Sequence, residues 1–203
     1  MFSIVRLLIA IVVFALGFLI IRKTSEQRRK FKTVILAFAS IIICIGLSFV
    51  LFENTFVSFK SPQEAFEYMH LGKYNFPLIV EGDKSDFVVG EKNAKFTIMI
   101  VPKTESGWKI RNSLSNRVGT YSSEDVSIVV YNYEGTNDYY ISAFFIKGGT
   151  TVVKDSQNSE FFTTQQYNGY TNKTYVTYYT HITDFSQDYW IDIENIHITR
   201  SLL

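Results

Sequence analysis

Apolar and polar residues follow two different patterns along this chain, and the change falls near residue 52. Before it, two long apolar runs, residues 7–21 and 33–52, flank a polar and basic connector at residues 22–32. A helix needs about 20 apolar residues to cross the core of a bilayer. The pattern therefore predicts a membrane α-hairpin, with helices at about residues 4–21 and 33–52.

The basic connector predicts the orientation of such a hairpin. Residues 22–32 contain six Lys or Arg side chains, and short loops rich in these residues stay on the cytoplasmic side of a membrane. The protein would then be a multi-pass protein of the cell membrane with both termini outside, and residues 53–203 would form an extracytoplasmic domain. A cleaved signal peptide fits less well, because the first apolar run continues directly into Arg22 and Lys23.

Small residues mark one face of the second apolar run. Ser40, Cys44 and Ser48 are spaced four residues apart, which places them on one side of a helix. Small side chains on such a face allow two helices to approach closely. We expect this face to pack on the first helix or, alternatively, on another integral membrane protein. The lipid bilayer is the other expected partner.

Beyond residue 52, the first recognisable element is a short helix. Ser61 fits its N-cap, Pro62 its first position and Glu64 the third position of a capping box. Ala65 and the apolar residues that follow it at helical spacing form a buried face. Gly72 is a suitable stop signal for this helix.

The rest of the chain has the short, turn-bounded apolar runs of antiparallel strands. Strands are expected first at residues 76–81, 87–89, 96–101 and 108–110, as a meander whose first strand lies at an edge because it contains Pro77. After a polar segment at residues 111–125, they are expected at residues 126–133, 139–147, 150–154, 161–164, 174–182 and 189–199. The pattern predicts a mainly β (α+β) region, with an α+β subdomain at residues 53–112 and an antiparallel, sandwich-like β subdomain at residues 113–203.

The net charge of +1 conceals an asymmetry between the two parts of the chain. Residues 1–52 carry seven Lys or Arg and one acidic residue, whereas residues 53–203 carry 13 Lys or Arg and 18 acidic residues, giving charges of +6 and −5. An acidic second part without a basic stripe argues against nucleic-acid binding. Aromatic residues make up 16% of the chain, which argues against disorder, and a single Cys excludes a disulfide scaffold.

The sequence contains none of the usual catalytic or metal-binding motifs. The three histidines, His70, His181 and His197, form no zinc-ligand pattern, and no G-x-S-x-G or S-x-x-K motif is present. Oxygen-rich turns such as residues 155–160 lack the spacing of a calcium loop. We therefore expect no metal, no cofactor and no catalytic residue. One alternative stays open: His181 and His197, which can be cross-strand neighbours, are candidates for a Ser–His–acid site if either meets an acid beside a pocket.

Tyrosine offers the one clue to binding. Tyr131, Tyr133, Tyr139 and Tyr140 crowd a predicted hairpin in the second subdomain. A tyrosine side chain presents an apolar face and a polar tip, which suits ligand recognition. These four are the candidate ligand-binding residues. The alternative is that they form aromatic pairs across neighbouring strands.

Two short motifs carry a resemblance to a known group of proteins. One is an F-x-S-P-x-E-A-F helix start at residues 59–66, and the other is a D-S-x-x-S-x-F strand and turn at residues 155–161. Together with the helical hairpin, they resemble small bacterial membrane proteins of Gram-positive type whose function is unassigned. The resemblance implies an outline of the fold, and it carries over no catalytic residue and no ligand.

The function expected from these features is that of a membrane-anchored extracytoplasmic binding or sensing module without catalysis of its own. Two alternatives remain. One is a cell-envelope hydrolase that uses His181 or His197. The other is an accessory or immunity-type subunit of a membrane complex, in which the helical hairpin is the working part.

Overall fold

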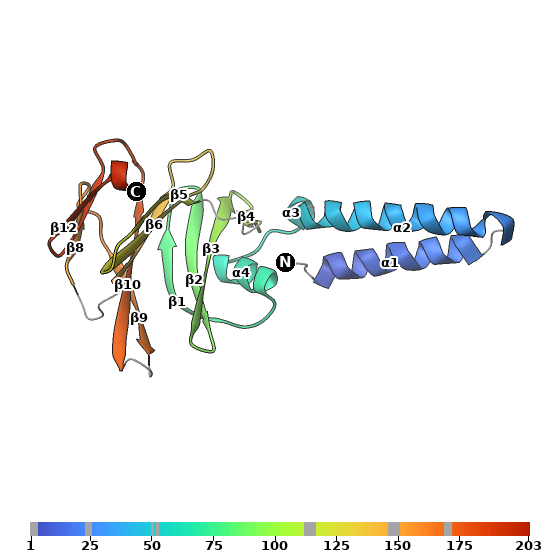
Figure 1. The fold of residues 1–203 in the computed structure, drawn as a ribbon, viewed down its shortest axis with the longest axis horizontal. Coiled ribbons are helices and arrows are strands. Elements are labelled where there is room, and N and C mark those ends of the chain that lie inside the picture. The colour runs from blue at the N-terminus through green and yellow to red at the C-terminus, as the bar shows by residue number, and fades with distance from the viewer. Residues whose placement is uncertain are drawn as a thin grey trace.

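In the computed structural model, a pair of long helices projects from a body made mainly of β-sheet (Figure 1). The structure describes residues 4–22, 26–49, 51, 53–111, 117–145, 151–168 and 172–203. Among these residues, the helices are α1 (Ile4–Arg22), α2 (Glu26–Phe49), α3 (Glu53–Phe56) and α4 (Pro62–His70), and a 3-10 turn, η1, covers Arg200–Leu202.

Within the described ranges, the strands form three sheets, and every strand pairing is antiparallel. The first sheet has the order β1-β2-β3-β4, with β1 (Asn75–Glu81), β2 (Ser85–Lys92), β3 (Lys95–Thr104) and β4 (Gly107–Trp108). The second sheet has the order β5-β6-β7-β10-β9, with β5 (Arg117–Ser122), β6 (Val126–Asn132), β7 (Tyr139–Phe145), β10 (Lys173–Ile182) and β9 (Phe162–Asn168). The third sheet has the order β12-β11-β8, with β12 (Ile196–Thr199), β11 (Trp190–Ile193) and β8 (Val153–Asp155).

The prediction of a membrane hairpin is contradicted by the structure. Within the part of the chain that the structure describes, no helix combines the length and the apolar character that a membrane span requires. With this finding, the predicted multi-pass position in a cell membrane, the two outward-facing termini and the extracytoplasmic domain are corrected as well.

Charged positions at the helix ends give the physical reason for this correction. The connector expected at residues 22–32 is largely helical, because α2 begins at Glu26 and holds the basic residues in its first two turns. At 1.5 Å per residue, the uncharged stretch of α1 between Arg6 and Arg22 spans about 22 Å, and that of α2 from Thr33 to Phe49 about 26 Å. A bilayer core is about 30 Å thick.

The two long helices pack side by side. Gly17 of α1 faces Leu36 of α2 so closely that an added Cβ would lie 2.2 Å from Leu36 Cδ1. Ser40 is buried in the same pair. The side chains of Cys44 and Ser48 lie outside the described residues, so the packing face predicted from Ser40, Cys44 and Ser48 stays a prediction.

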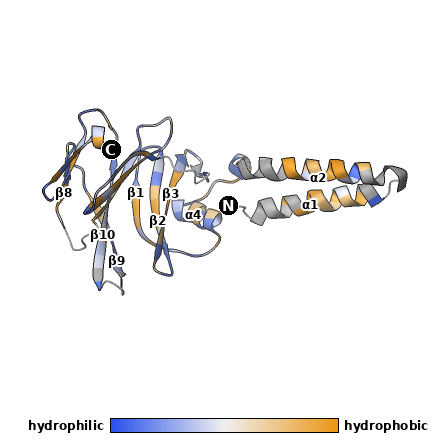
Figure 2. Cartoon of the chain, in the orientation of Figure 1, coloured by the Kyte–Doolittle hydropathy of each residue, from blue (hydrophilic) through white to orange (hydrophobic). Residues whose placement is uncertain are grey.

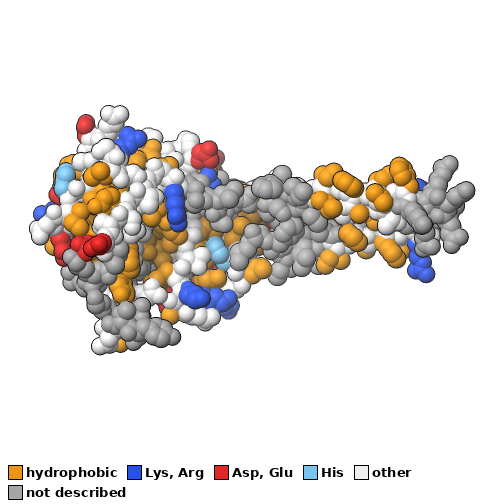
Figure 3. All heavy atoms as spheres, viewed as in Figure 1, with side chains coloured by type: hydrophobic (Ala, Val, Ile, Leu, Met, Phe, Trp, Pro, Cys, Tyr) orange, Lys and Arg blue, Asp and Glu red, His pale blue; other side chains and the backbone are white. Residues whose placement is uncertain are grey.

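Hydrophobic residues lie along both long helices (Figure 2), and among the described residues several large apolar side chains are exposed on their surface (Figure 3). Phe38 and Ile42 of α2 are each 66% exposed, and Phe14 and Phe18 of α1 are more than half exposed. A single exposed apolar residue is ordinary, but a continuous surface of this kind usually marks a site of interaction with another molecule.

The short helix α4 forms as predicted from its capping residues. Ser61 is the N-cap, and its hydroxyl accepts a hydrogen bond from the Glu64 backbone N–H at 3.2 Å. The Glu64 carboxylate accepts from the Lys60 N–H at 2.9 Å, one residue earlier than a standard capping box requires. At the other end, Leu71 adopts the left-handed conformation with φ 50°. Phe66 of α4 packs onto the first sheet where β2 has Gly90.

The sheets are stacked in layers, with α4 on the outer face of the first sheet. Strand β2 is buried on both faces, because Val88 contacts the α4 side while Phe87 and Val89 point toward the second sheet. The core between the first and second sheets is aromatic, and Phe87 contacts Tyr131, Tyr140 and Tyr179 there.

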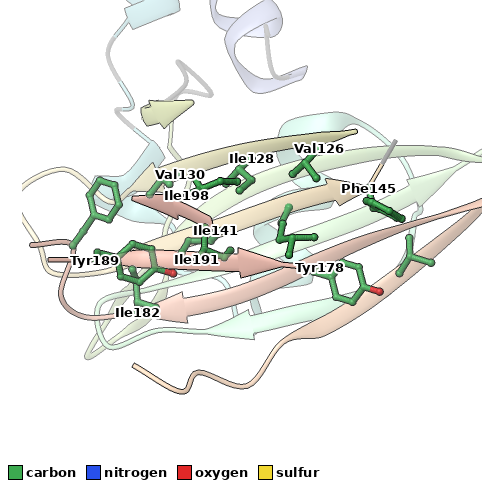
Figure 4. Packing of buried hydrophobic residues seen from close by; sticks show 14 residues of the cluster. Val126, Ile128, Val130, Ile141, Phe145, Tyr178, Ile182, Tyr189, Ile191 and Ile198 are labelled. Carbon is green, nitrogen blue, oxygen red and sulfur yellow. The ribbon is translucent and has the colours of Figure 1, made fainter. Parts of the chain in front are cut away.

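The core between the second and third sheets is largely aliphatic (Figure 4). Alternating residues of β6, β7 and β10 meet Ile191 and Ile198 of the third sheet, and Tyr189 closes one end of this cluster. The expectation of a mainly β, antiparallel and sandwich-like region is thus confirmed. The first four strands form the expected meander, with the Pro77 strand β1 at its edge.

The junction between the helical pair and the β body is held by hydrogen bonds. The Asn54 side chain of α3 pairs with the backbone of Ile110 in both directions, at 2.8 and 2.9 Å. The Lys109 ammonium donates to the Asn54 carbonyl at 2.8 Å, to the Val57 carbonyl at 2.9 Å and to the Ser58 hydroxyl at 2.7 Å. These contacts join α3 and the residues after it to the segment that follows β4.

Candidate functional site

A buried aspartate, Asp138, stands at the centre of the candidate site. It precedes β7 and is 1% exposed. The loop before it is held by Asn132, whose side-chain amide donates to the carbonyls of Thr136 at 3.1 Å and of Asp138 at 3.0 Å. The Asp138 N–H donates in turn to the Thr136 hydroxyl at 3.2 Å. The hairpin between β6 and β7 therefore presents the Asp138 carboxylate in a fixed direction.

The carboxylate of Asp138 binds the turn between β1 and β2. It accepts hydrogen bonds from the backbone N–H groups of Asp83 at 3.0 Å and Lys84 at 2.7 Å, and from the Ser85 hydroxyl at 2.9 Å. Burial alone would raise the pKa of Asp138, but these hydrogen bonds, together with one from His181, hold its pKa below the usual range. Asp138 is therefore an ionised group that links the first sheet to the second.

Tyr140 of β7, two residues after Asp138, also contacts the start of β2 and completes this link. Its hydroxyl donates to the Ser85 carbonyl at 2.7 Å and lies 2.9 Å from the Ser85 hydroxyl. Burial raises the pKa of Tyr140, so the phenol remains a neutral donor. Gly82 permits the approach, because an added Cβ at that position would lie 2.2 Å from the Tyr140 hydroxyl.

His181 brings the buried cluster to the surface. It lies on β10 directly opposite Tyr140 of β7, and its Nε2 is 3.0 Å from Asp138 Oδ1, the oxygen that also accepts from the Asp83 N–H. Because Asp138 is ionised and can only accept, Nε2 carries the hydrogen. The Nδ1 atom is then the nitrogen that His181 can offer to another molecule, and the residue is 17% exposed.

A pocket of about 450 Å³ opens beside His181. It lies where β1, the edge strand of the first sheet, meets β9 and β10 at the edge of the second sheet. The lining residues are Ile79, Val80 and Glu81 from β1, Ser159 and Glu160 from the segment before β9, Phe162 from β9, and Thr180 and His181 from β10. Val80 faces the second sheet from β1, whereas Ile79 and Glu81 border the pocket with their side chains on the α4 face of that strand.

The segment that carries Ser159 and Glu160 is held by a buried aspartate. Asp155 Oδ1 accepts from the N–H groups of Gln157 at 3.2 Å and Ser159 at 2.8 Å, and Asp155 Oδ2 accepts from the Tyr189 hydroxyl at 3.1 Å. The Thr180 hydroxyl donates to the Glu160 carbonyl at 2.8 Å. This oxygen-rich turn, considered for calcium from the sequence, is therefore closed by hydrogen bonds from the protein itself.

The structure distributes the four candidate tyrosines around the core and its rim. Tyr131 and Tyr140 are buried between the first and second sheets, where both contact Phe87. Tyr133 is partly covered by the Arg111 guanidinium at 4.8 Å, and Tyr139 packs against Phe185. None of the four lines the pocket beside His181. Their ligand-binding role stays a prediction.

The two C-terminal histidines do not meet. His181 pairs across the second sheet with Tyr140, whereas His197 lies on β12 and pairs with Asp192 of the third sheet. His197 Nδ1 is 2.6 Å from the Asp192 carboxylate on an exposed surface. The expectation that they are cross-strand neighbours is wrong.

The groups around His181 can be compared with the requirements of a serine nucleophile and of a metal site. Ser85, the serine in contact with Asp138, is buried, and its hydroxyl bonds to the carboxylate and not to the imidazole. A serine nucleophile would instead have to donate its hydrogen to the histidine. In the described part of the chain, no three His, Cys, Asp or Glu side chains come close enough to hold a metal ion.

No protein-family model, no curated protein and no solved structure matches this chain. The resemblance to small Gram-positive-type membrane proteins therefore stays a prediction from the sequence. The residues of the site have to be interpreted from their geometry alone.

Proposed function

We propose that this protein is a binding module whose ligand site is the pocket between β1, β9 and β10. The observation that supports the proposal is the position of His181. The buried Asp138 accepts a hydrogen bond from one ring nitrogen of His181 and so fixes the ring, and His181 itself lines a pocket of about 450 Å³. Ligand sites that hold drug-sized molecules have volumes of roughly 300–1,000 Å³, so this pocket is of suitable size.

The rigidity of its walls also favours a binding role. The pocket joins two sheets that share a buried core, and the link through Asp138, Ser85 and Tyr140 holds their edges together. A site built on such elements loses little conformational freedom when a ligand binds, which favours affinity. No catalytic step is part of this proposal.

Methyl groups in the pocket wall provide a direct test. In the methyl-labelled full chain, a set of small molecules that covers cationic, anionic and neutral classes is screened by NMR. We expect at least one class to shift the Val80 methyl signals and to leave those of Ile128 and Val130, in the core under the third sheet, in place.

A matched pair of variants on β9 controls this screen. Phe162→Ala removes an apolar wall of the pocket and should weaken binding, whereas Tyr167→Ala, which also lies on an exposed part of β9 but does not line the pocket, should leave it unchanged. The proposal fails if no class shifts the two methyl signals, or if both variants weaken binding equally.

A cell-envelope hydrolase is a weaker candidate. The sequence predicts such a site only if a histidine meets an acid beside a pocket, and the Asp138–His181 pair meets this requirement. However, no hydrogen bond in the described structure joins a serine hydroxyl to His181. A hydrolase would convert a ligand that shifts the Val80 methyl signals, and His181→Gln would abolish turnover. A ligand that binds and remains unaltered after prolonged incubation argues against this function.

An accessory subunit of a larger complex is a second candidate. The exposed apolar side chains of the helical pair, Phe38 and Ile42 among them, favour this function. Replacing these two by Gln should reduce the size of the native complex on a non-denaturing gel. The matched change Phe162→Gln on the β body should not. If the complex keeps its size in the Phe38/Ile42 variant as well as in Phe162→Gln, this result counts against the function of an accessory subunit.

A further inference from the structure

We infer that the ligand of this pocket is an extended polypeptide segment, which pairs with the free edge of β9 and places an apolar side chain in the pocket beside His181. This inference rests on the proposed binding function and specifies the chemical class of the ligand. Three features support it: the free edge of β9, the protection of the other sheet edges, and the position of the pocket along β9.

Strand β9 is an edge strand whose backbone pairs on one side. Its seven residues pair in continuous register with β10, from Phe162 opposite Tyr179 to Asn168 opposite Lys173. In the described part of the chain, no strand pairs with the other side of β9 (Figure 1). Strand β1 lies beside β9 but belongs to another sheet. The N–H and C=O groups on the free side of an edge strand are a template for pairing with a further strand.

The residues of β9 leave this edge open. The strand has the sequence FTTQQYN, without a charged residue, a proline or a glycine, and its pairing with β10 contains no bulge. Charged side chains, prolines and bulges are the means by which proteins prevent an edge strand from pairing with another chain. The side chains of Phe162 and Tyr167 are 39% and 63% exposed, so the strand is accessible from solvent.

The other sheet edges in the described ranges are each protected. Strand β1 contains Pro77 and has an irregular register with β2. Strand β4 has two residues, and its outer side pairs with Phe59. On β5, the Thr120 N–H donates to the Leu203 carbonyl. Strands β8 and β12 are three and four residues long. The open edge of β9 is therefore an exception within this fold.

The pocket lies at the Phe162 end of this edge. Phe162 is the first residue of β9 and lines the pocket together with Val80 and His181. Its partner across the sheet, Tyr179, lies in the core between the first and second sheets, and directly opposite residues point to the same face. A residue of an added strand that is placed opposite Phe162 would point to this face as well, and its side chain would reach the pocket.

The neighbouring side chains specify what such a segment should carry. Val80 and Phe162 form an apolar wall, which favours an aliphatic side chain in the pocket. Thr163 and Gln165, on the other face of β9, are exposed and uncharged, so they suit neutral polar residues. In this mode of recognition, backbone hydrogen bonds provide affinity and a pocket for alternate side chains provides specificity.

A short peptide that alternates threonine with valine, blocked at both ends, tests the inference on the full chain. Its counterpart, N-methylated at every residue, keeps the side chains but cannot donate backbone hydrogen bonds. We expect the first peptide to slow hydrogen exchange of the β9 amides by about tenfold and to shift the Val80 methyl signals, and the N-methylated peptide to do neither. The amides of β5, at the opposite edge of the same sheet, should exchange as before.

A matched pair of variants assigns the effect to the pocket end of β9. Phe162→Ala should weaken binding of the peptide by about fivefold, because the apolar wall is lost. Val118→Ala, at an exposed apolar position of β5, should leave it unchanged.

Three results would overturn the inference. One is equal binding of the two peptides, and another is an equal effect of the two variants. The third is protection of the β9 amides that rises with protein concentration when no peptide is present, because the occupant of the edge would then be a second copy of this chain.

The outcome also separates failure of the inference from failure of the proposed function. If small molecules shift the Val80 methyl signals and the peptide leaves the β9 amides unprotected, the pocket binds ligands other than peptides, and the inference alone fails. If the peptide protects the β9 amides but no probe shifts the Val80 methyl signals, the pocket is not the ligand site. The proposed function then fails, and the inference that rests on it fails as well.

Discussion

Asp138 shows how a single residue determines the environment of the candidate site. It accepts four hydrogen bonds from three different elements: the β1–β2 turn, Ser85 and His181. Charged acceptors form stronger hydrogen bonds than neutral ones, and the removal of one partner leaves buried donors unsatisfied. Asp138 is thus needed both for the stability of the sheet junction and for the orientation of His181.

Replacing Asp138 by Asn tests whether this carboxylate stabilises the junction between the two sheets. The amide group would direct its own hydrogens toward donors, and we expect the free energy of unfolding at pH 7 to fall by about 2–3 kcal/mol. Urea unfolding followed by fluorescence measures the change. Asp188→Asn, at an exposed aspartate, should alter stability by less than about 0.5 kcal/mol.

The stabilising contribution of Asp138 should also depend on pH. The folded pKa of Asp138 lies below the ordinary value of 3.8, so its stabilising contribution is complete above that value and is lost as the pH falls through the folded pKa. The difference in stability between the parent protein and Asp138→Asn should therefore be constant from pH 7 to pH 5 and should shrink below about pH 4. A difference that persists unchanged at pH 2 would contradict this account.

At the scale of elements, the contact between α4 and the first sheet depends on a missing side chain. Gly90 of β2 lies under the fully buried ring of Phe66, and an added Cβ would come within 2.6 Å of Phe66 Cε1 and Cζ. The backbone at Gly90 is ordinary for a strand, so the glycine is required by the close approach of the ring and not by its own conformation.

Gly90→Ala should therefore lower the free energy of unfolding by about 1–3 kcal/mol, the usual cost of overpacking a core. In a Phe66→Leu background the same substitution should cost less, because the shorter side chain leaves room for the methyl group. Urea denaturation of the four proteins in this double-mutant cycle gives the coupling. Equal costs in the two backgrounds would show that Phe66 is not the residue that Gly90 accommodates.

The elements were largely predictable from the sequence, but the contacts between them were not. Ser61 and Pro62 specify α4 by local capping rules, and Pro77 indicates an edge strand, because both effects act within a few residues. Strand β5 was missed, since its segment is polar and only Gly119 in it is buried.

The candidate site could be predicted only in part. His181 was singled out, but its acid partner lies 43 residues earlier in the chain, and Glu81 comes from another sheet. Asp138 directly follows a turn and gave no signal of its own. The prediction of a membrane hairpin was wrong, because no helix in the described part of the chain has both the length and the apolar character of a membrane span.

At the scale of the whole molecule, the segment that leads from α2 into the β body is anchored through α3. Asn54 pairs with the Ile110 backbone, and Lys109 binds two carbonyl groups and a hydroxyl at the end of α3. The helical pair projects from the body in Figure 1, and these side chains hold the α3 end of the connection to the first sheet.

Lys109→Met should weaken the attachment of α3 to the β body by a free energy of about 1–2 kcal/mol, because hydrogen bonds from a charged donor are lost. Spin labels at residues 37 and 122, in a Cys44→Ser background, report the distance between the helical pair and the β body. We expect a broader distance distribution in Lys109→Met than in the matched variant Lys95→Met, whose lysine lies exposed at the start of β3. Identical distributions would contradict a role for Lys109 in the junction.

The long-range contacts of Asp138 also have a consequence for the order in which the protein is made. The groups that it binds in the β1–β2 turn lie 53 to 55 residues earlier in the chain. At a synthesis rate of about 5–20 residues per second, the ribosome adds Asp138 about 3–10 s after that turn. During this interval Phe87 and Val89, which end up between two sheets, have only the first sheet to cover them. The nascent chain therefore passes through a stage at which its first sheet is complete in sequence but lacks the partner that buries its inner face, and this is the stage at which a chaperone would be of most use.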